Sequence, residues 1–249
     1  MNVMDGTDVM DGTDALMLTF TRALIEARHC KRAYLAKPVP RDMVAHVLRV
    51  AANAPSSRNG QPWRIAVVSG AARDALSRAL CAELERGAPP APDYANRPPV
   101  LDPIAERRAA VAGEGVLSAK GIARDDAAGR RAHQRDNMRF HGAPLEMILH
   151  LPKGAPPGHF LDAGFFLQNV MLALVACGLG SCPQFSVAGY ADAIRKQLGL
   201  LPDRIVVCGL AVGYPDEAVP VNRFVPPRAE LEEYVTWHDH APPENTARE

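Results

Sequence analysis

The sequence predicts a single domain in which helices cover both faces of a small β-sheet. The chain has 249 residues, a length at which one large core forms readily. Stretches with the apolar spacing of helices alternate with three short apolar runs, and up to two further strands are expected. Elements interspersed in this way pack as a sheet between helical layers. We place this domain at residues 15–240, between flexible tails at residues 1–14 and 241–249.

The first elements follow from hydrophobic periodicity. Apolar residues at helical spacing predict helices over residues 14–27, 41–54 and 71–86. Residues 63–69 are apolar and β-branched, which predicts a strand. A polar loop bounded by prolines, residues 55–62, separates the second helix from this strand.

A proline-rich loop at residues 87–103 precedes the remaining elements. The charged stretch at residues 107–139 is predicted to be mostly helical and broken by glycines, as in an excursion or a lid. Further helices are predicted at residues 163–177 and 187–198, and further strands at residues 145–151 and 205–212. The glycines of Gly178-Leu-Gly180 predict a helix C-cap. A final extended segment, residues 231–237, has no evident partner strand, so we expect it to pair with a second subunit.

Composition argues against several classes of protein. Lys plus Arg and Asp plus Glu are both 28 and only 6% of residues are aromatic, so no nucleic-acid partner is expected. The five cysteines include no Cys-x-x-Cys, which favours a reducing cytoplasm. The most apolar stretch, residues 163–180, carries Gln168 and Asn169 at its centre, as a core helix does and a membrane span rarely does. The acidic N-terminal repeat lacks the pattern of a signal peptide.

Common cofactor and catalytic motifs are absent from the sequence. It contains no Gly-x-Gly-x-x-Gly turn, P-loop, His-Glu-x-x-His or Gly-x-Ser-x-Gly. Trp237-His238-Asp239-His240 places two histidines beside a carboxylate, but no second ligand cluster accompanies it. We therefore expect no metal site.

The first of four polar clusters is Arg28-His29-Cys30-Lys31-Arg32, directly after a predicted helix. In an extended segment Arg28, Cys30 and Arg32 share one side. The planar guanidinium fork suits a phosphate or a ring carbonyl. The alternative is a solvated basic turn that satisfies the last carbonyls of the helix.

The other three clusters also have two interpretations each. Residues 55–63 hold two hydroxyls and two amides, which suit the edge of a heterocycle or an ordinary capped turn. Residues 178–185 begin with glycines, which allow a ligand to approach the backbone or simply end a helix. Residues 213–228 carry Arg223 and Arg228, either for an anion or on a surface loop.

In this order the clusters resemble the FMN-dependent nitroreductase family, from about residue 23 to residue 238. The stretches that carry the resemblance are the arginine cluster with Pro38-Val-Pro40, Ala54-Pro-Ser-Ser-x-Asn-x-Gln-Pro-Trp63, Phe140-x-Gly-Ala-Pro144, Gly178-Leu-Gly180 and Gly213-Tyr-Pro215. The loop ending in Gln61-Pro62-Trp63 is the most specific of them. The resemblance implies an α+β three-layer sandwich with a mostly antiparallel sheet. It also implies a homodimer that exchanges C-terminal segments and holds one FMN in each of two interface sites.

The resemblance assigns roles to residues. Contacts to the phosphate, ribityl chain or pyrimidine of FMN would come from Arg28, His29, Cys30 and Arg32. The other subunit would contribute Pro55, Ser56, Ser57 and Asn59. Pro183 and Gln184 would lie along the isoalloxazine ring, and Arg228 would reach the phosphate.

Two positions depart from the family's pattern. Cys30 stands where the family usually has serine, and Val225 stands near the usual place of a basic residue. We expect Arg223 to compensate for the missing basic residue. Candidates for lining the acceptor pocket are Phe140, His141 and Phe185, together with Arg139.

The implied activity is reduction of nitroaromatic, quinone-like or related acceptors with NADH or NADPH, by a ping-pong mechanism in which the flavin carries the chemistry. No further catalytic residue is expected. A reductive dehalogenase or an ene-reductase on the same fold is the enzymatic alternative. An FMN storage or sensor protein and a structural dimer without cofactor are the non-enzymatic alternatives.

Overall fold

The computed structural model describes residues 12–96 and 98–238, and these contain a four-stranded sheet. The strands are β1 (Arg64–Ser69), β2 (Leu145–Pro152), β3 (Gly180–Gln184) and β4 (Arg204–Gly213). Their order in space is β1-β2-β4-β3, and all three pairings are antiparallel. The strands β2 and β4 are therefore central, and β1 and β3 are edges.

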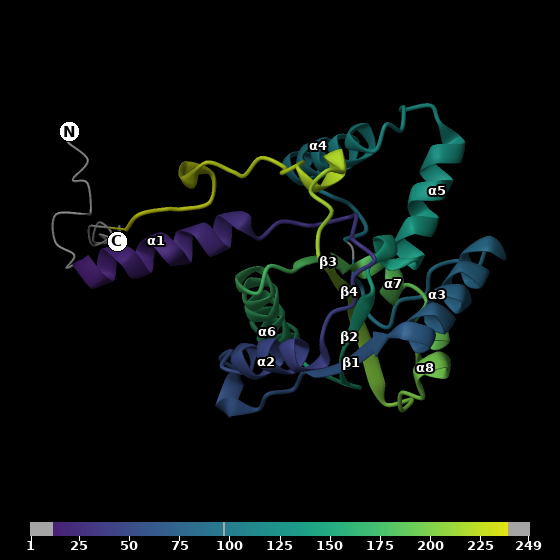
Figure 1. Cartoon of the computed structure of the whole chain (residues 1–249), viewed down its shortest axis with the longest axis horizontal. Helices are drawn as coiled ribbons and strands as arrows, with labels where there is room; N and C mark the ends of the chain where they lie inside the picture. The colour runs from purple at the N-terminus through teal and green to yellow at the C-terminus, as the bar shows by residue number, and fades with distance from the viewer. Residues whose placement is uncertain (1–11, 97, 239–249) are drawn as a thin grey trace, which may run out of the picture.

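Helices cover both faces of the sheet (Figure 1). One layer contains α2 (Arg41–Ala51) and α6 (Pro157–Ala176), and the other contains α3 (Gly70–Glu85), α7 (Phe185–Ala188) and α8 (Ala191–Leu198). This arrangement confirms the expected α+β three-layer sandwich with an antiparallel sheet.

Side chains of β2 alternate between the two layers of the core. Leu145 and Met147 pack in the cluster with α2 and α6, whereas Ile148 packs in the cluster with α3 and α8. The rings of Trp63 and Phe166 stack at 4.8 Å in the first cluster. β2 is buried along nearly its whole length because helices lie on both sides of it.

Helix α6 is the core helix that its composition predicts. By length and composition alone it is the one helix in the described part of the chain that would suffice to cross a membrane. Seven of its residues are nevertheless buried, including Phe166 and Leu174, and it packs against α2 and β3. The helix begins at Pro157, six residues before the predicted start, because the apolar pattern is weak in its first turns.

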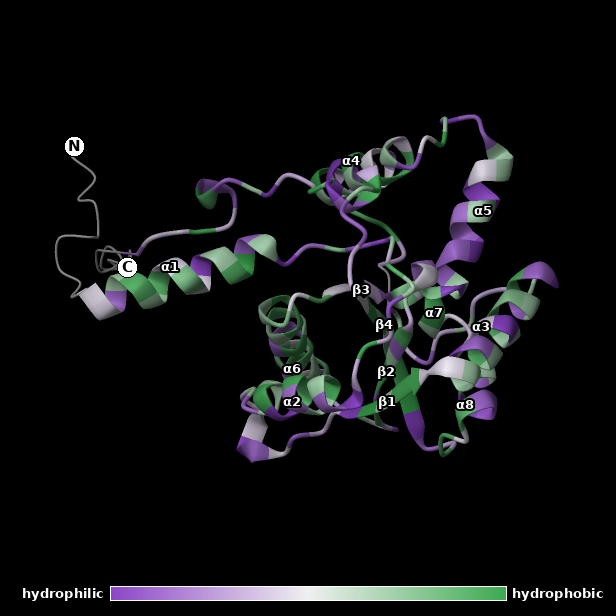
Figure 2. Ribbon diagram, in the orientation of Figure 1, coloured by the Kyte–Doolittle hydropathy of each residue, from purple (hydrophilic) through white to green (hydrophobic). Residues whose placement is uncertain are grey.

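Helix α1 (Gly12–Ala27) extends away from the sandwich (Figure 1). Much of the helix is hydrophobic (Figure 2), yet none of its residues is buried. The apolar side chains of Leu16, Met17 and Phe20 are all more than half exposed. Residues 12–14 of the predicted tail belong to this helix. The rest of that tail and the tail at 241–249 lie outside the described residues.

The charged stretch is helical, as predicted, and forms α4 (Pro103–Ala119) and α5 (Ala127–Met138) beyond one end of the sheet (Figure 1). Pro103 occupies the first turn of α4, and the side chain of Asp102 accepts hydrogen bonds from the N–H groups of Ile104 and Ala105. The helix start therefore has the N-cap and proline that favour it.

Two predictions of local structure are wrong. Residues 180–184, predicted as a turn after a helix, form the edge strand β3. This strand tolerates Pro183 because it pairs with β4 along one side only. The helix predicted at residues 187–198 is divided into α7 and α8 at Gly189. Residues 231–237 contain a short 3-10 turn at Leu231–Glu233 and no strand within the chain, and their pairing with a second subunit stays a prediction.

Candidate active site

The basic segment after α1 runs beside the edge strand β3. Cys30 forms a parallel bridge with Ser181, and the Lys31 N–H donates to the Ser181 carbonyl at 3.0 Å. The backbone here is therefore extended, and successive side chains alternate. Arg28, His29, Cys30 and Arg32 all line one cavity, whereas Lys31 is buried away from it.

Lys31 packs closely against Gly180, the first residue of β3. A Cβ on Gly180 would lie 2.6 Å from Cγ of Lys31, so only glycine leaves room for the lysine stem. The Lys31 ammonium contacts a carboxylate oxygen of Glu217 at 2.7 Å and donates to the Asn222 carbonyl at 3.1 Å. The second glycine of Gly178-Leu-Gly180 therefore permits a close backbone approach.

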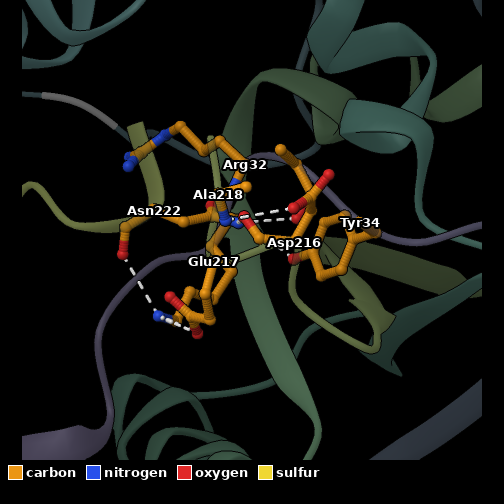
Figure 3. A network of polar contacts seen from close by, with 8 residues as sticks. Arg32, Tyr34, Asp216, Glu217, Ala218 and Asn222 are labelled. Carbon is orange, nitrogen blue, oxygen red and sulfur yellow. Dashed lines mark hydrogen bonds and ion pairs between the residues drawn. The ribbon is translucent and has the colours of Figure 1, made fainter. Parts of the chain in front are cut away.

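Asn222 connects the loop after β4 to the same segment (Figure 3). Its side chain is fully buried and accepts a hydrogen bond from the Arg32 N–H at 2.6 Å. Its amide nitrogen donates to the carbonyls of Ala33 and Asp216 at 2.7 and 2.9 Å. These three bonds occupy both the oxygen and the nitrogen of the carboxamide, and they fix the backbone at Arg32.

Gly213 provides a second close approach. A Cβ at this position would lie 2.7 Å from Cδ of Pro144 and 3.0 Å from the ring of Tyr34. The Tyr34 hydroxyl donates to the Lys31 carbonyl at 2.8 Å. The glycine of Gly213-Tyr-Pro215 and the proline of the segment at residues 140–144 therefore pack together beneath the arginine segment.

Four arginines line a cavity of about 490 Å³, here called the arginine cavity, and one of them is Arg130 of α5. Arg28 and Arg32 come from the extended segment, and Arg228 comes from the C-terminal loop. Phe224 forms another part of the wall, and its ring lies directly on Gly115 of α4, where a Cβ would overlap it. The C-terminal loop is thus held against α4 at the place where it supplies Arg228.

A second cavity of about 970 Å³, here called the ring cavity, adjoins the first. Pro183, Gln184 and Phe185 lie in its wall, and Arg32 and Asn137 line both cavities. The Gln184 amide donates to the Asn137 carbonyl at 2.9 Å, which joins β3 to α5. The two cavities together offer a cationic end and a broader, partly apolar end.

Several buried polar atoms around these cavities have no hydrogen-bond partner in the chain. They are Arg28 Nε, His29 Nδ1, His133 Nδ1 and Gln184 Oε1. A buried polar atom without a partner costs about 1–3 kcal/mol. A ligand that carries an anionic group and a polar ring would provide an acceptor for the guanidinium nitrogen of Arg28 and a donor for the amide oxygen of Gln184.

Burial and positive neighbours change the titration of groups in the arginine cavity. Desolvation and Lys31 lower the pKa of His29, and desolvation and Lys120 lower the pKa of His133. The neighbouring thiol of Cys182, assisted by Arg32, lowers the pKa of Cys30 to about 6. Both imidazoles are therefore neutral at neutral pH, whereas the surroundings of Cys30 favour its thiolate.

The polar loop before β1 lies apart from both cavities of its own chain. Its predicted site residues, Pro55, Ser56, Ser57 and Asn59, line neither cavity. The Ser57 N–H donates to Asp162 of α6 at 3.2 Å. Arg58, Asn59 and Gln61 have φ of 51°, 55° and 44°, a left-handed conformation that costs about 1–3 kcal/mol per residue. Strain of this kind concentrates at functional sites.

The candidates from the segment before β2 differ in their surroundings. Phe140 is fully buried in the core and lines neither the arginine cavity nor the ring cavity. His141 and Arg139 line a third cavity of about 520 Å³, together with Arg32. Desolvation, with Lys120 and Arg32 nearby, lowers the pKa of His141 to about 2. Arg223 is exposed and lines none of the three cavities.

Some residues of the site were not singled out from the sequence. His133 and Asn137 stand four residues apart on α5, and this spacing places both on the helix face that meets the cavities. Phe224 and the structural role of Asn222 depend on contacts between distant segments. Within residues 12–96 and 98–238 no cluster of metal-ligating side chains occurs, while Asp239 and His240 lie outside the described residues.

Comparison with known proteins gives a consistent result. Residues 25–214 match the nitroreductase family. Chloronitrobenzene nitroreductase of Comamonas testosteroni is 38% identical, with 88% of this chain and 96% of the relative aligned. Nitroreductase NfnB of Mycolicibacterium smegmatis is 36% identical, with 84% and 89% aligned.

Solved structures are similar over the same region. The FMN and NADPH-dependent nitroreductase NfnB from Sphigopyxis sp. strain HMH superposes with a TM-score of 0.86 at 38% identity, covering 88% of this chain and 99% of that one. The FMN-dependent NfnB from Mycobacterium smegmatis in complex with NADPH gives a TM-score of 0.85 at 34% identity, covering 89% and 99%.

Proposed function

The chain belongs to the nitroreductase family, and we propose that it is an FMN-dependent oxidoreductase that uses NADPH to reduce nitroaromatic compounds. The observation that carries this proposal is the pair of adjoining cavities that share Arg32. One has four arginines in its wall, and the other has Pro183 and Gln184. Relatives that are 34–38% identical are named for this cofactor, this electron donor or this class of acceptor.

The residues present fit FMN. Arg28, Arg32 and Arg228 offer guanidinium donors for a phosphate, which arginine binds in bidentate geometry. The buried, unpaired Oε1 of Gln184 suits an N–H donor of a heteroaromatic ring. The cavity volumes of about 490 and 970 Å³ are typical of cofactor sites. Cys30 in place of the family's usual serine keeps a small polar side chain at the same position.

When bound, FMN supplies two-electron transfer between a reduced nicotinamide and an acceptor. The chain's residues position it and set its electrostatic surroundings. Arg28 and Arg32 would place positive charge beside the bound cofactor, where it would stabilise negative charge. Pro183 lacks an N–H and presents a flat apolar surface to the ring cavity.

A ping-pong order follows from a single place for both substrates. The sequence has no dinucleotide-binding fingerprint, so the nicotinamide needs only to reach the ring cavity, transfer its hydride and leave. Phe185 is 45% exposed at the wall of this cavity, where an aromatic acceptor would stack next. Nitroaromatic, quinone-like and related flat acceptors all satisfy this requirement.

We propose that two copies of the chain form the working enzyme. Helix α1 presents Leu16, Met17 and Phe20 to solvent at 54–62% exposure, and Tyr234 and Trp237 of the C-terminal segment are 69% and 72% exposed. An apolar helix of this kind is typical of a surface that a second subunit covers. The strained loop at residues 55–61 would then reach the cavities of the partner. All five cysteines are free, which suits a cytoplasmic enzyme.

Mixed dimers test both the cofactor site and the dimer. Arg32→Glu alters the arginine cavity, and Ser56→Ala with Asn59→Gly alters the loop without adding a Cβ at its positive φ. Each variant alone should lose FMN. Co-expression should restore about a quarter of the wild-type sites, because half of the dimers are mixed and each mixed dimer has one intact site. Isolated mixed dimers without FMN would contradict the shared site.

A further inference from the structure

Two thiols meet where the arginine segment lies beside β3. Cys30 is bridged to Ser181, and Cys182 is the next residue along the strand. Both cysteines pack into the core cluster that contains Ala211 and Phe140. Each sulfur lies near enough to shift the ionisation of the other, and the Cys182 thiol also lies 3.8 Å from the carbonyl oxygen of Pro183. A disulfide requires a Cα separation of about 4.4–6.8 Å, which is the range expected for residues on directly adjacent backbones.

The surroundings give the two sulfurs different characters. Cys30 lies in the arginine cavity with Arg28, Arg32 and Arg228, and the neighbouring thiol of Cys182 together with these cations favours its thiolate. Cys182 is 3% exposed, and burial together with the neighbouring Cys30 sulfur keeps it as a thiol. A reactive thiolate beside a protonated thiol is the arrangement of redox-sensing cysteine pairs.

We propose that Cys30 and Cys182 form a reversible redox pair, in which Cys30 reacts with hydrogen peroxide and Cys182 resolves the product to a disulfide. In the first step the Cys30 thiolate attacks one peroxide oxygen, the O–O bond breaks, hydroxide leaves, and the sulfur becomes a sulfenic acid. In the second step the Cys182 sulfur attacks the Cys30 sulfur, the S–S bond forms, and water leaves with the thiol proton. The protein is oxidised by two electrons and the peroxide is reduced.

This chemistry goes beyond the proposed reduction of nitroaromatics and does not require it. It depends on the cysteine that stands in place of the family's usual serine. Oxidation removes the negative charge of the Cys30 thiolate from beside Arg28, Arg32 and Arg228, and reduction by a dithiol restores it. The redox state of the pair therefore sets the charge of the arginine cavity.

Peptide mapping of the purified full-length chain tests the proposal. The protein is treated with hydrogen peroxide, its remaining thiols are alkylated, and it is digested with trypsin and chymotrypsin without reduction. We expect residues 29–31 linked to residues 180–185, and a loss of two of the five thiols that dithiothreitol reverses. Cleavage after Leu179 separates Cys182 from Cys177, so the link is unambiguous.

Variants assign the two roles. Cys182→Ser should accumulate sulfenic acid at Cys30, which dimedone traps, and Cys30→Ser should retain all its thiols. Cys177→Ser is the matched control, because Cys177 follows α6 outside this cluster, and it should form the same disulfide as the wild type. Absence of the linked peptide from the oxidised wild type, or equal oxidation of Cys81, Cys177 and Cys30, would overturn the proposal.

Discussion

The carboxamide oxygen of Asn222 accepts a hydrogen bond from the backbone N–H of Arg32 at 2.6 Å, although the two residues are 190 positions apart in the chain. The same side chain donates to the carbonyls of Ala33 and Asp216. A fully buried amide with every strong donor and acceptor used in this way fixes the segments that it joins. The position of Arg32 between the two cavities therefore depends on a residue that lines neither of them.

Replacing Asn222 by alanine should disorder the arginine segment. Three hydrogen bonds are lost and a buried N–H is left without a partner, so we expect a loss of about 3 kcal/mol in the free energy of unfolding. FMN affinity, measured by fluorescence titration, should fall with it. Asn53→Ala, at an exposed helix end, is the control and should change neither quantity much. Unchanged FMN affinity in Asn222→Ala would show that Asn222 does not position Arg32.

Gly213→Ala should destabilise the fold beneath the site. The added methyl would meet the ring atoms of Pro144 and Tyr34, which cannot move without displacing the segments that carry them. Overpacking of this kind costs about 2 kcal/mol, which urea unfolding measures. Gly158→Ala is the matched control, since a Cβ there meets open space. Equal stabilities of the two variants would contradict the close approach.

Glu146→Gln should stabilise the protein increasingly as pH rises. Glu146 is fully buried on β2, neither carboxylate oxygen has a side-chain partner, and burial raises its pKa well above the usual 4.5. Above about pH 4.5 the unfolded chain releases a proton that the folded state retains, so the wild type loses about 1.4 kcal/mol per pH unit from this group. Glutamine has no such proton. The free energy of unfolding at several pH values checks this, with exposed Glu106→Gln as the control. A constant difference between Glu146→Gln and wild type would contradict it.

His141→Asn should have the opposite pH dependence. His141 is 7% exposed, and burial lowers its pKa to about 2, so the folded state stays neutral while the unfolded histidine takes up a proton below about pH 6.5. The wild type therefore loses about 1.4 kcal/mol per pH unit from this group as pH falls from 6 to 4. Asparagine tolerates the φ of 53° at this position and removes that loss. Urea unfolding at these pH values should give a shallower slope for this variant than for His46→Asn, an exposed control.

Much of the fold follows from local patterns. β1, β2 and β4 are apolar runs bounded by turn residues, and their positions agree with the sequence prediction. β3 escaped prediction because glycine and proline have low strand propensity, and its formation depends on pairing with β4. The break at Gly189 was also missed, since the apolar periodicity continues from α7 into α8.

The site is predictable to the extent that its residues are adjacent in sequence. Arg28 and Arg32 were found because an extended basic segment places alternate side chains together. Asn222 and Phe224 act through contacts with Arg32 and Gly115, and no local pattern indicates those pairings. Phe140, predicted to line a pocket, lies in the core, because its backbone turns the ring inward at the start of β2.

The visible absorption spectrum of the purified protein, followed anaerobically, tests the central claim most directly. We expect bands near about 370 and 450 nm that NADPH bleaches and that a nitroaromatic compound such as 4-nitrobenzoate restores, because the flavin carries the electrons. Bands that persist with both NADPH and NADH would instead indicate an FMN storage or sensor protein. No bands after addition of FMN would show that the cavities joined at Arg32 do not hold this cofactor.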